Sequence, residues 1–226
     1  MPINVVDLLR GRALLRGVQP PLPVAVLTME LQRGVMGDLA SFPQLGDAAR
    51  ARGVPENAGR LAAAARELSL PVIHCTAAFR PDRAGTIVNT PLHAAVLRND
   101  EHLIEGTPFV ELIPELKLAE ADLVIQRYHG VSPFLGTSLD ATLRNLGIST
   151  LVVTGVSLNL GVLGLCIEAA NLGYQILLAT DAVCGVPAEY GDVILNETYS
   201  LIATLLPTSE VITALHTAVG SQTDIV

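Results

Sequence analysis

The sequence predicts an α/β fold with three layers, in which helices cover both faces of a six-stranded, mostly parallel sheet. Short apolar runs rich in β-branched residues recur along the chain, and segments with a helical period separate them. Strands that alternate with helices are typical of a parallel sheet covered on both faces. The 226 residues suffice for one large core, and no linker interrupts them. We therefore expect an N-terminal arm (1–22) followed by one domain (23–226).

The first half of the chain predicts two strands and one helix. Residues 23–29 (PVAVLTM) form a buried strand, launched by the prolines that precede it. Residues 55–69 repeat apolar side chains at helical spacing, with Pro55 near the start, and 70–76 (LPVIHCT) form a second buried strand. Residues 77–119 are irregular and rich in proline, as lids and subunit contacts often are.

The second half predicts a denser alternation of elements. A helix at 138–146 has Thr137 or Ser138 as its N-cap and ends at Gly147. The remaining elements are strands at 122–127, 149–156 and 174–182, helices at 158–172 and 188–205, and a segment at 209–215 (SEVITAL) that closes the chain.

Composition excludes several classes of function. The net charge of −8 argues against nucleic acid and gives no attraction to anionic membranes. No transmembrane span or signal peptide is evident, so we expect a cytoplasmic protein. Hydrophobic residues make up 50% and charged residues 16% of the chain, which favours a homodimer or homotetramer. The three cysteines have no CxxC spacing, so neither a disulfide framework nor a thiolate metal site is expected.

A site is expected at the carboxyl ends of the parallel strands. The residues found there are Glu30, 76–78, 127–129, 155–161 and Asp181. No glycine-rich phosphate loop occurs, and His93 and His102 lack ligand spacing. We therefore expect no cofactor and no metal, and a small molecule as the binding partner.

Three stretches together carry a recognisable pattern: LTMELQRGV, RYHGVSPFLGTSLDATLRNLGISTLVVTGVSLNLGV and EAANLGYQILLATDAV. Over residues 23–215 the chain resembles the isochorismatase-like (cysteine hydrolase) superfamily. The resemblance implies a catalytic Asp after the first strand, a Lys after the third, and a Cys at the start of the helix after the fourth. A helix N-terminus favours the thiolate of such a Cys, and backbone N–H groups there would bind an oxyanion.

This chain departs from the family pattern at all three positions. Glu30 takes the place of the Asp, Tyr128 that of the Lys, and Gly161 that of the Cys. Strand alternation is expected to point Arg127 away from Tyr128 and from the site. Cys166 lies too far into the helix to replace the nucleophile, and Cys75 and Cys184 are read as packing residues.

A glycine at the nucleophile position also resembles the branch of true isochorismatases, which cleave a vinyl ether without a thiol. That resemblance implies a non-covalent mechanism in which Glu30, kept protonated by apolar surroundings, is the acid, or else the base. We expect the rest of the site to be formed by Tyr128, His129, Phe134, Ser157, Asn159, Leu160 and Gly161, and a cis peptide between Val156 and Ser157.

The function prediction is a hydrolase of a small metabolite, acting on a vinyl ether or C–N bond. The alternative is a catalytically silent family member that binds a metabolite or serves as a scaffold. An open, polar cavity beside Glu30 would favour the enzyme. A cavity filled by Tyr128, Leu158 or Leu160 would favour the silent protein.

Overall fold

The computed structural model describes residues 20–223, so nearly all of the expected N-terminal arm lies outside the described residues. Six strands form one sheet in the order β3-β2-β1-β4-β5-β6, and every pairing is parallel. The strands are β1 (Val24–Met29), β2 (Val72–Ala77), β3 (Leu123–Arg127), β4 (Thr150–Val156), β5 (Gln175–Cys184) and β6 (Thr204–Leu206). The α/β fold with a six-stranded sheet is confirmed.

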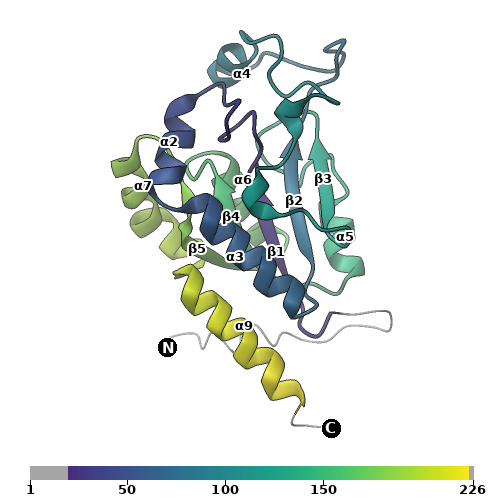
Figure 1. The fold of residues 1–226 in the computed structure, drawn as a ribbon, viewed down its shortest axis with the longest axis vertical. Helices are drawn as coiled ribbons and strands as arrows, with labels where there is room; N and C mark the ends of the chain where they lie inside the picture. The colour runs from purple at the N-terminus through teal and green to yellow at the C-terminus, as the bar shows by residue number, and fades with distance from the viewer. Residues whose placement is uncertain (1–19, 224–226) are drawn as a thin grey trace.

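Helices cover both faces of this sheet (Figure 1). On one face, apolar side chains of α3 and α9 pack against the sheet, and on the other face those of α5 and α6 do so. The helices are α2 (Pro43–Ala51), α3 (Val54–Glu67), α4 (Pro91–Val96), α5 (Leu139–Asn145), α6 (Gly161–Asn171), α7 (Ala188–Ile194), α8 (Ser200–Ile202) and α9 (Thr208–Thr223), with short helical turns η1 (Pro108–Val110), η2 (Pro114–Leu116) and η3 (Leu195–Tyr199). Within residues 20–223, no helix is long and apolar enough to cross a membrane.

The end of the chain differs from the sequence expectation. The sixth strand is Thr204–Leu206, which overlaps the end of the helix expected at 188–205, and the closing segment 209–215 lies in α9. The backbone N–H and the hydroxyl of Thr208 both donate to Asp181 Oδ1, at 2.7 and 2.6 Å, which anchors the start of this helix. Buried residues then recur at helical spacing, namely Val211, Ala214, Leu215 and Ala218. Helix α2 also has no counterpart in the sequence expectation.

The irregular segment 77–119 folds across the carboxyl ends of β1 to β3, where α4 lies in Figure 1. Its prolines at 91, 108 and 114 each begin a short helix, α4, η1 and η2, because proline suits the first helical position. Gln32 ties the segment to the sheet. Its Nε2 donates to Ala77 O at 2.9 Å and Val110 O at 3.0 Å, and its Oε1 accepts from Ala77 N at 2.8 Å. The segment thereby forms one wall of a cavity.

Candidate active site

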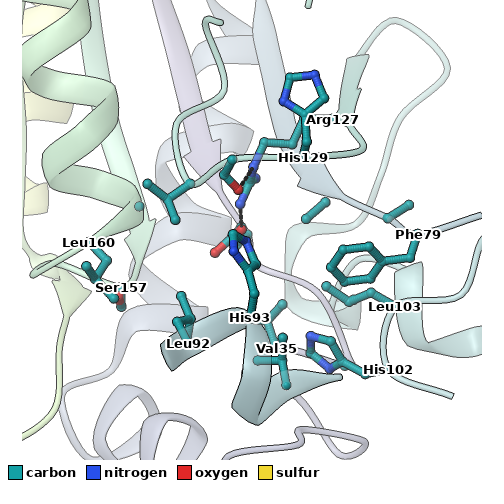
Figure 2. A pocket seen from close by; sticks show the side chains of 18 of the residues that line it. Val35, Phe79, Leu92, His93, His102, Leu103, Arg127, His129, Ser157 and Leu160 are labelled. Atoms are coloured by element: carbon teal, nitrogen blue, oxygen red, sulfur yellow. Dashed lines mark hydrogen bonds and ion pairs between the residues drawn. The ribbon is translucent and has the colours of Figure 1, made fainter. Parts of the chain in front are cut away.

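A cavity of about 120 Å³ opens at the carboxyl ends of the central strands. Glu30 directly after β1, Arg127 at the end of β3 and Gly161 at the start of α6 line it on the sheet side. Segment 77–119 closes the other side, and Figure 2 shows Phe79, Leu103 and His93 of this segment turned toward the cavity. The walls are mainly apolar with a few polar groups, the usual character of a small-molecule site. The cavity beside Glu30 is therefore open, as expected for the enzyme, but its walls are mainly apolar and not polar.

Glu30 adopts an unusual backbone conformation directly after β1. Its φ of 50° lies in the left-handed region, which costs a non-glycine residue on the order of 1 kcal/mol. Its N–H donates to Cys75 O at 2.9 Å, and its carbonyl accepts from Gln32 N at 2.8 Å. These bonds hold the turn and direct the carboxylate into the cavity, where the side chain is 15% exposed.

Arg127 corrects a sequence expectation. Its Nη2 donates to Glu30 Oε1 in a close ion pair, and its Nε donates to Gly130 O at 3.2 Å. Arg127 is the last residue of β3 and shares a strand face with Ile125, which packs against the α5/α6 side of the core. Alternation therefore turns Arg127 toward the site, and Tyr128 follows beyond the end of β3. Glu30 thus has a guanidinium against its carboxylate, not the apolar surroundings expected from the sequence.

Tyr128 and His129 lie at the rim of the cavity. The Tyr128 side chain is 40% exposed, and its hydroxyl donates to Glu105 Oε1 at 2.5 Å and accepts from Gln126 Nε2 at 2.8 Å. The hydrogen bond to Glu105 raises the pKa of Tyr128 above its usual value, so the hydroxyl stays neutral. His129 packs over Gly136, where an added Cβ would lie 2.9 Å from the imidazole Cε1. Both residues line the cavity. Among the described residues, neither forms a hydrogen bond with Glu30.

Gly161 leaves space directly beside Glu30. A Cβ placed on Gly161 would lie 2.9 Å from Met29 Cε and 3.5 Å from Glu30 Oε2. Gly161 is the first residue of α6, and its N–H finds no backbone acceptor among the described residues. Ser157 and Leu160 complete this side of the cavity, and the Val156–Ser157 peptide is cis, as expected. The helix start thus offers a free N–H group next to a carboxylate oxygen.

Two expected binding residues lie elsewhere. Phe134 is buried in the core, where its ring stacks on Tyr174 with centroids 5.9 Å apart. Asn159 turns its side chain toward Gly185, where an added Cβ would lie 2.8 Å from Oδ1. Leu158 is also fully buried in the core and does not fill the cavity. Glu30, Tyr128, His129, Ser157, Leu160 and Gly161 do line one cavity together.

None of the three cysteines is placed or ionised for nucleophilic attack. Burial raises the pKa of Cys75 and of Cys166 to about 12 and that of Cys184 to about 11. A thiol with such a pKa carries almost no thiolate near neutral pH. The structure bears out their assignment as packing residues.

Two histidines of the cavity carried no signal in the sequence. His93 on α4 and His102 farther along segment 77–119 are 9% and 6% exposed and both line the cavity. Burial, aided by the Arg83 guanidinium, lowers the pKa of His102 to about 4, so it is neutral near pH 7. Among the described residues no group of three or more His, Cys, Asp or Glu side chains could hold a metal ion.

Comparison with known proteins identifies the family. The family model described as the isochorismatase domain matches residues 24–210. This chain belongs to the isochorismatase family. It is 30% identical over 195 residues to the uncharacterized isochorismatase family protein YecD of Escherichia coli O157:H7, covering 84% of this chain and 95% of YecD.

Solved structures share the isochorismatase-family fold. A cysteine hydrolase from Pseudomonas syringae pv. phaseolicola superposes with a TM-score of 0.74 at 22% identity, over 92% of this chain and 99% of that one. An N-carbamoylsarcosine amidase from Thermoplasma acidophilum superposes with a TM-score of 0.63 at 23% identity, over 82% and 96% of the two chains.

Proposed function

We propose that this isochorismatase-family protein is a hydrolase that cleaves a small metabolite without a covalent enzyme intermediate. One observation carries the proposal: Glu30 Oε2 faces the space left by Gly161, inside an open cavity. The carboxylate of Glu30 is therefore held beside the position at which this chain has glycine and no nucleophilic side chain. Water fills the role that a thiolate would otherwise take.

The ion pair determines which oxygen of Glu30 is available. Arg127 holds Oε1, whereas Oε2 is directed toward Gly161. Arg127 donates to one oxygen of the carboxylate and leaves the other open to the cavity, so Glu30 is suited to accept a proton as a general base. This favours cleavage of a C–N bond, which begins with removal of a proton from water, over a vinyl ether, which begins with protonation of carbon.

The reaction then follows from the groups at hand. Glu30 takes a proton from water as the water oxygen adds to the electrophilic carbon of the substrate. The developing negative charge on the substrate oxygen is stabilised by the free N–H of Gly161 at the start of α6. Glu30 returns its proton to the leaving nitrogen as the C–N bond breaks, which restores the carboxylate.

Two observations favour the alternative, a catalytically silent protein that binds a metabolite. The cavity walls are mainly apolar, and the residues at two of the three family catalytic positions lack the usual chemistry. A protein of this kind would bind a metabolite in the same cavity without converting it. The open space beside Glu30 favours the enzyme.

The proposal is tested by assaying the purified protein on a panel of small amides and a vinyl ether such as isochorismate. Replacing a general base should lower the rate by roughly 10²–10⁴-fold, so we expect Glu30→Gln to abolish detectable turnover. Glu67→Gln, on the exposed face of α3, is the matched control and should keep full activity. Turnover that survives Glu30→Gln would overturn the assignment of the base. No turnover on the whole panel would favour the silent protein.

A further inference from the structure

His93 is a buried polar side chain that the proposed mechanism does not use. It lies on α4 in segment 77–119, is 9% exposed and lines the cavity that contains Glu30. Figure 2 shows its imidazole turned from α4 into the cavity, toward Arg127. A nine-tenths buried polar ring costs free energy unless a partner satisfies it, and a ligand can be that partner.

Hydrogen bonds at the base of the ring fix its tautomer. His93 Nδ1 lies 3.1 Å from Asn89 Oδ1 and 3.0 Å from Thr90 Oγ1. An amide oxygen only accepts hydrogen bonds, so Nδ1 carries the proton in the neutral ring. Nε2 then has a lone pair, and no hydrogen bond to it is found among the described residues. His93 thus presents a hydrogen-bond acceptor to the cavity.

The other two cavity histidines do not offer the same group. His102 Nδ1 lies 2.8 Å from Ser41 Oγ, and a hydroxyl can donate as well as accept, so its tautomer is not fixed. His129 is exposed at the rim, over Gly136. Of the three cavity histidines, His93 is therefore the one whose hydrogen bonds leave an oriented acceptor, Nε2.

We infer that His93 is a specificity-determining residue, whose Nε2 accepts a hydrogen bond from an N–H or O–H group of the substrate. This inference rests on the proposed function and narrows its substrate class. The mainly apolar walls fit a small hydrocarbon body, and His93 selects a donor beside the scissile carbonyl, as in a primary carboxamide. A carbonyl compound of equal size without that donor leaves Nε2 unpaired and binds less well.

The tautomer is tested first, by long-range ¹H–¹⁵N spectra of the full chain with labelled histidine. The resonance of His93 is assigned by its loss in His93→Gln. We expect neutral His93 to carry its proton on Nδ1, and Asn89→Ala to weaken that preference. A proton on Nε2 in the wild-type protein would overturn the inference.

Binding is tested with two probes of nearly equal shape, isobutyramide and methyl isopropyl ketone, which differ by an NH₂ against a CH₃ group. We expect the amide to bind about fivefold more tightly, the effect of one neutral hydrogen bond, and to shift His93 Nε2. His93→Leu should abolish this preference. His93→Gln, which keeps an acceptor near the Nε2 position, should retain part of it, and the exposed His216→Gln should retain all of it.

The outcomes separate this inference from the proposed hydrolysis. Glu30→Gln removes catalysis but should leave the amide-over-ketone preference, because that preference belongs to His93. Equal affinity of the wild-type protein for the two probes would overturn the inference. So would a preference unchanged in His93→Leu, or an amide that fails to shift His93 up to its solubility limit.

Discussion

Arg127 and Glu30 form a nearly buried ion pair that joins the ends of two strands separated by β2 in the sheet. Their side chains are 6% and 15% exposed, and Arg127 Nη2 donates to Glu30 Oε1. Arg127 Nη1 is also buried and has no partner among the described residues. The pair orients one carboxylate oxygen and leaves the other toward the cavity. The same ion pair therefore stabilises the edge strand β3 and orients the carboxylate of the site.

Replacing Arg127 should destabilise the protein markedly. Arg127→Met leaves Glu30 without its counter-charge in a largely buried place, which costs about 2–4 kcal/mol of the free energy of unfolding. The double variant Glu30→Leu/Arg127→Met should recover much of the loss. The measurement is chemical denaturation. The matched control is Arg80→Met, which breaks an exposed pair with Asp82 and should cost less than about 1 kcal/mol. An equal loss of unfolding free energy in Arg127→Met and Arg80→Met would contradict a buried ion pair between Arg127 and Glu30.

A methyl group at Gly161 should fill the space beside Glu30. In Gly161→Ala the new Cβ meets Met29 Cε at 2.9 Å, and because this is the end of a flexible side chain it can yield. We expect a loss of about 1–2 kcal/mol of folding free energy and a clear loss of isobutyramide binding in an NMR titration. Gly220→Ala is the control, since a Cβ there meets nothing within 4 Å. Unchanged binding of isobutyramide in Gly161→Ala would show that the probe does not occupy the space between Gly161 and Glu30.

The sequence predicted the layers of the fold and the region of the site because both depend on local patterns. Apolar runs mark β1, β2 and β4, and the carboxyl ends of parallel strands bring Glu30 and Gly161 together. The expected direction of Arg127 was wrong, because Tyr128, the residue taken to face the site, lies beyond the end of β3. Within the strand, alternation from Ile125 identifies Arg127 as the inward residue.

His93 could not be found from the sequence for a different reason. Segment 77–119 has no period to fix its direction, so nothing in the chain indicates that α4 lies over the cavity. The Thr90-Pro91 start of α4 is an N-cap that can be recognised in the sequence. In the structure the Thr90 hydroxyl accepts a hydrogen bond from His93 N at 3.2 Å. That pattern predicts a helix but not which element it faces. Tertiary contacts decide that α4 lies over the cavity.

The native protein should resist thiol reagents. Cys75, Cys166 and Cys184 are buried, and burial raises each pKa to about 11 or above. We expect almost no reaction with Ellman's reagent at mildly alkaline pH, and reaction of all three thiols after unfolding. Cys75→Ala, at the thiol nearest Glu30 along the sheet, should leave any hydrolytic activity in place. Loss of turnover after labelling a native thiol would contradict the thiol-free mechanism.

Folding stability should fall as the pH drops below neutrality. His74 is fully buried between Thr28 and Asp122, and burial lowers its pKa, as it lowers that of His102 to about 4. The unfolded chain binds protons on these rings near pH 6.5, where the folded protein does not. Protonation therefore favours the unfolded state, and stability present above pH 6.5 is lost as the pH falls. Lowering the pH from about 7 to about 5 should remove roughly 2 kcal/mol through His102 alone.

The pH effect can be assigned to individual rings by substitution. His102→Gln removes one group that titrates only in the unfolded chain, so the fall in unfolding free energy between neutral and mildly acidic pH should shrink. His216→Gln, exposed on α9, should leave the fall unchanged. Denaturant titrations at a series of pH values measure both variants. An undiminished fall in His102→Gln would assign the effect to His74. Hydrogen bonds from Arg66, the backbone of Ala119 and His74 hold the pKa of Asp122 below its usual value, so Asp122 loses its stabilisation only at more acidic pH.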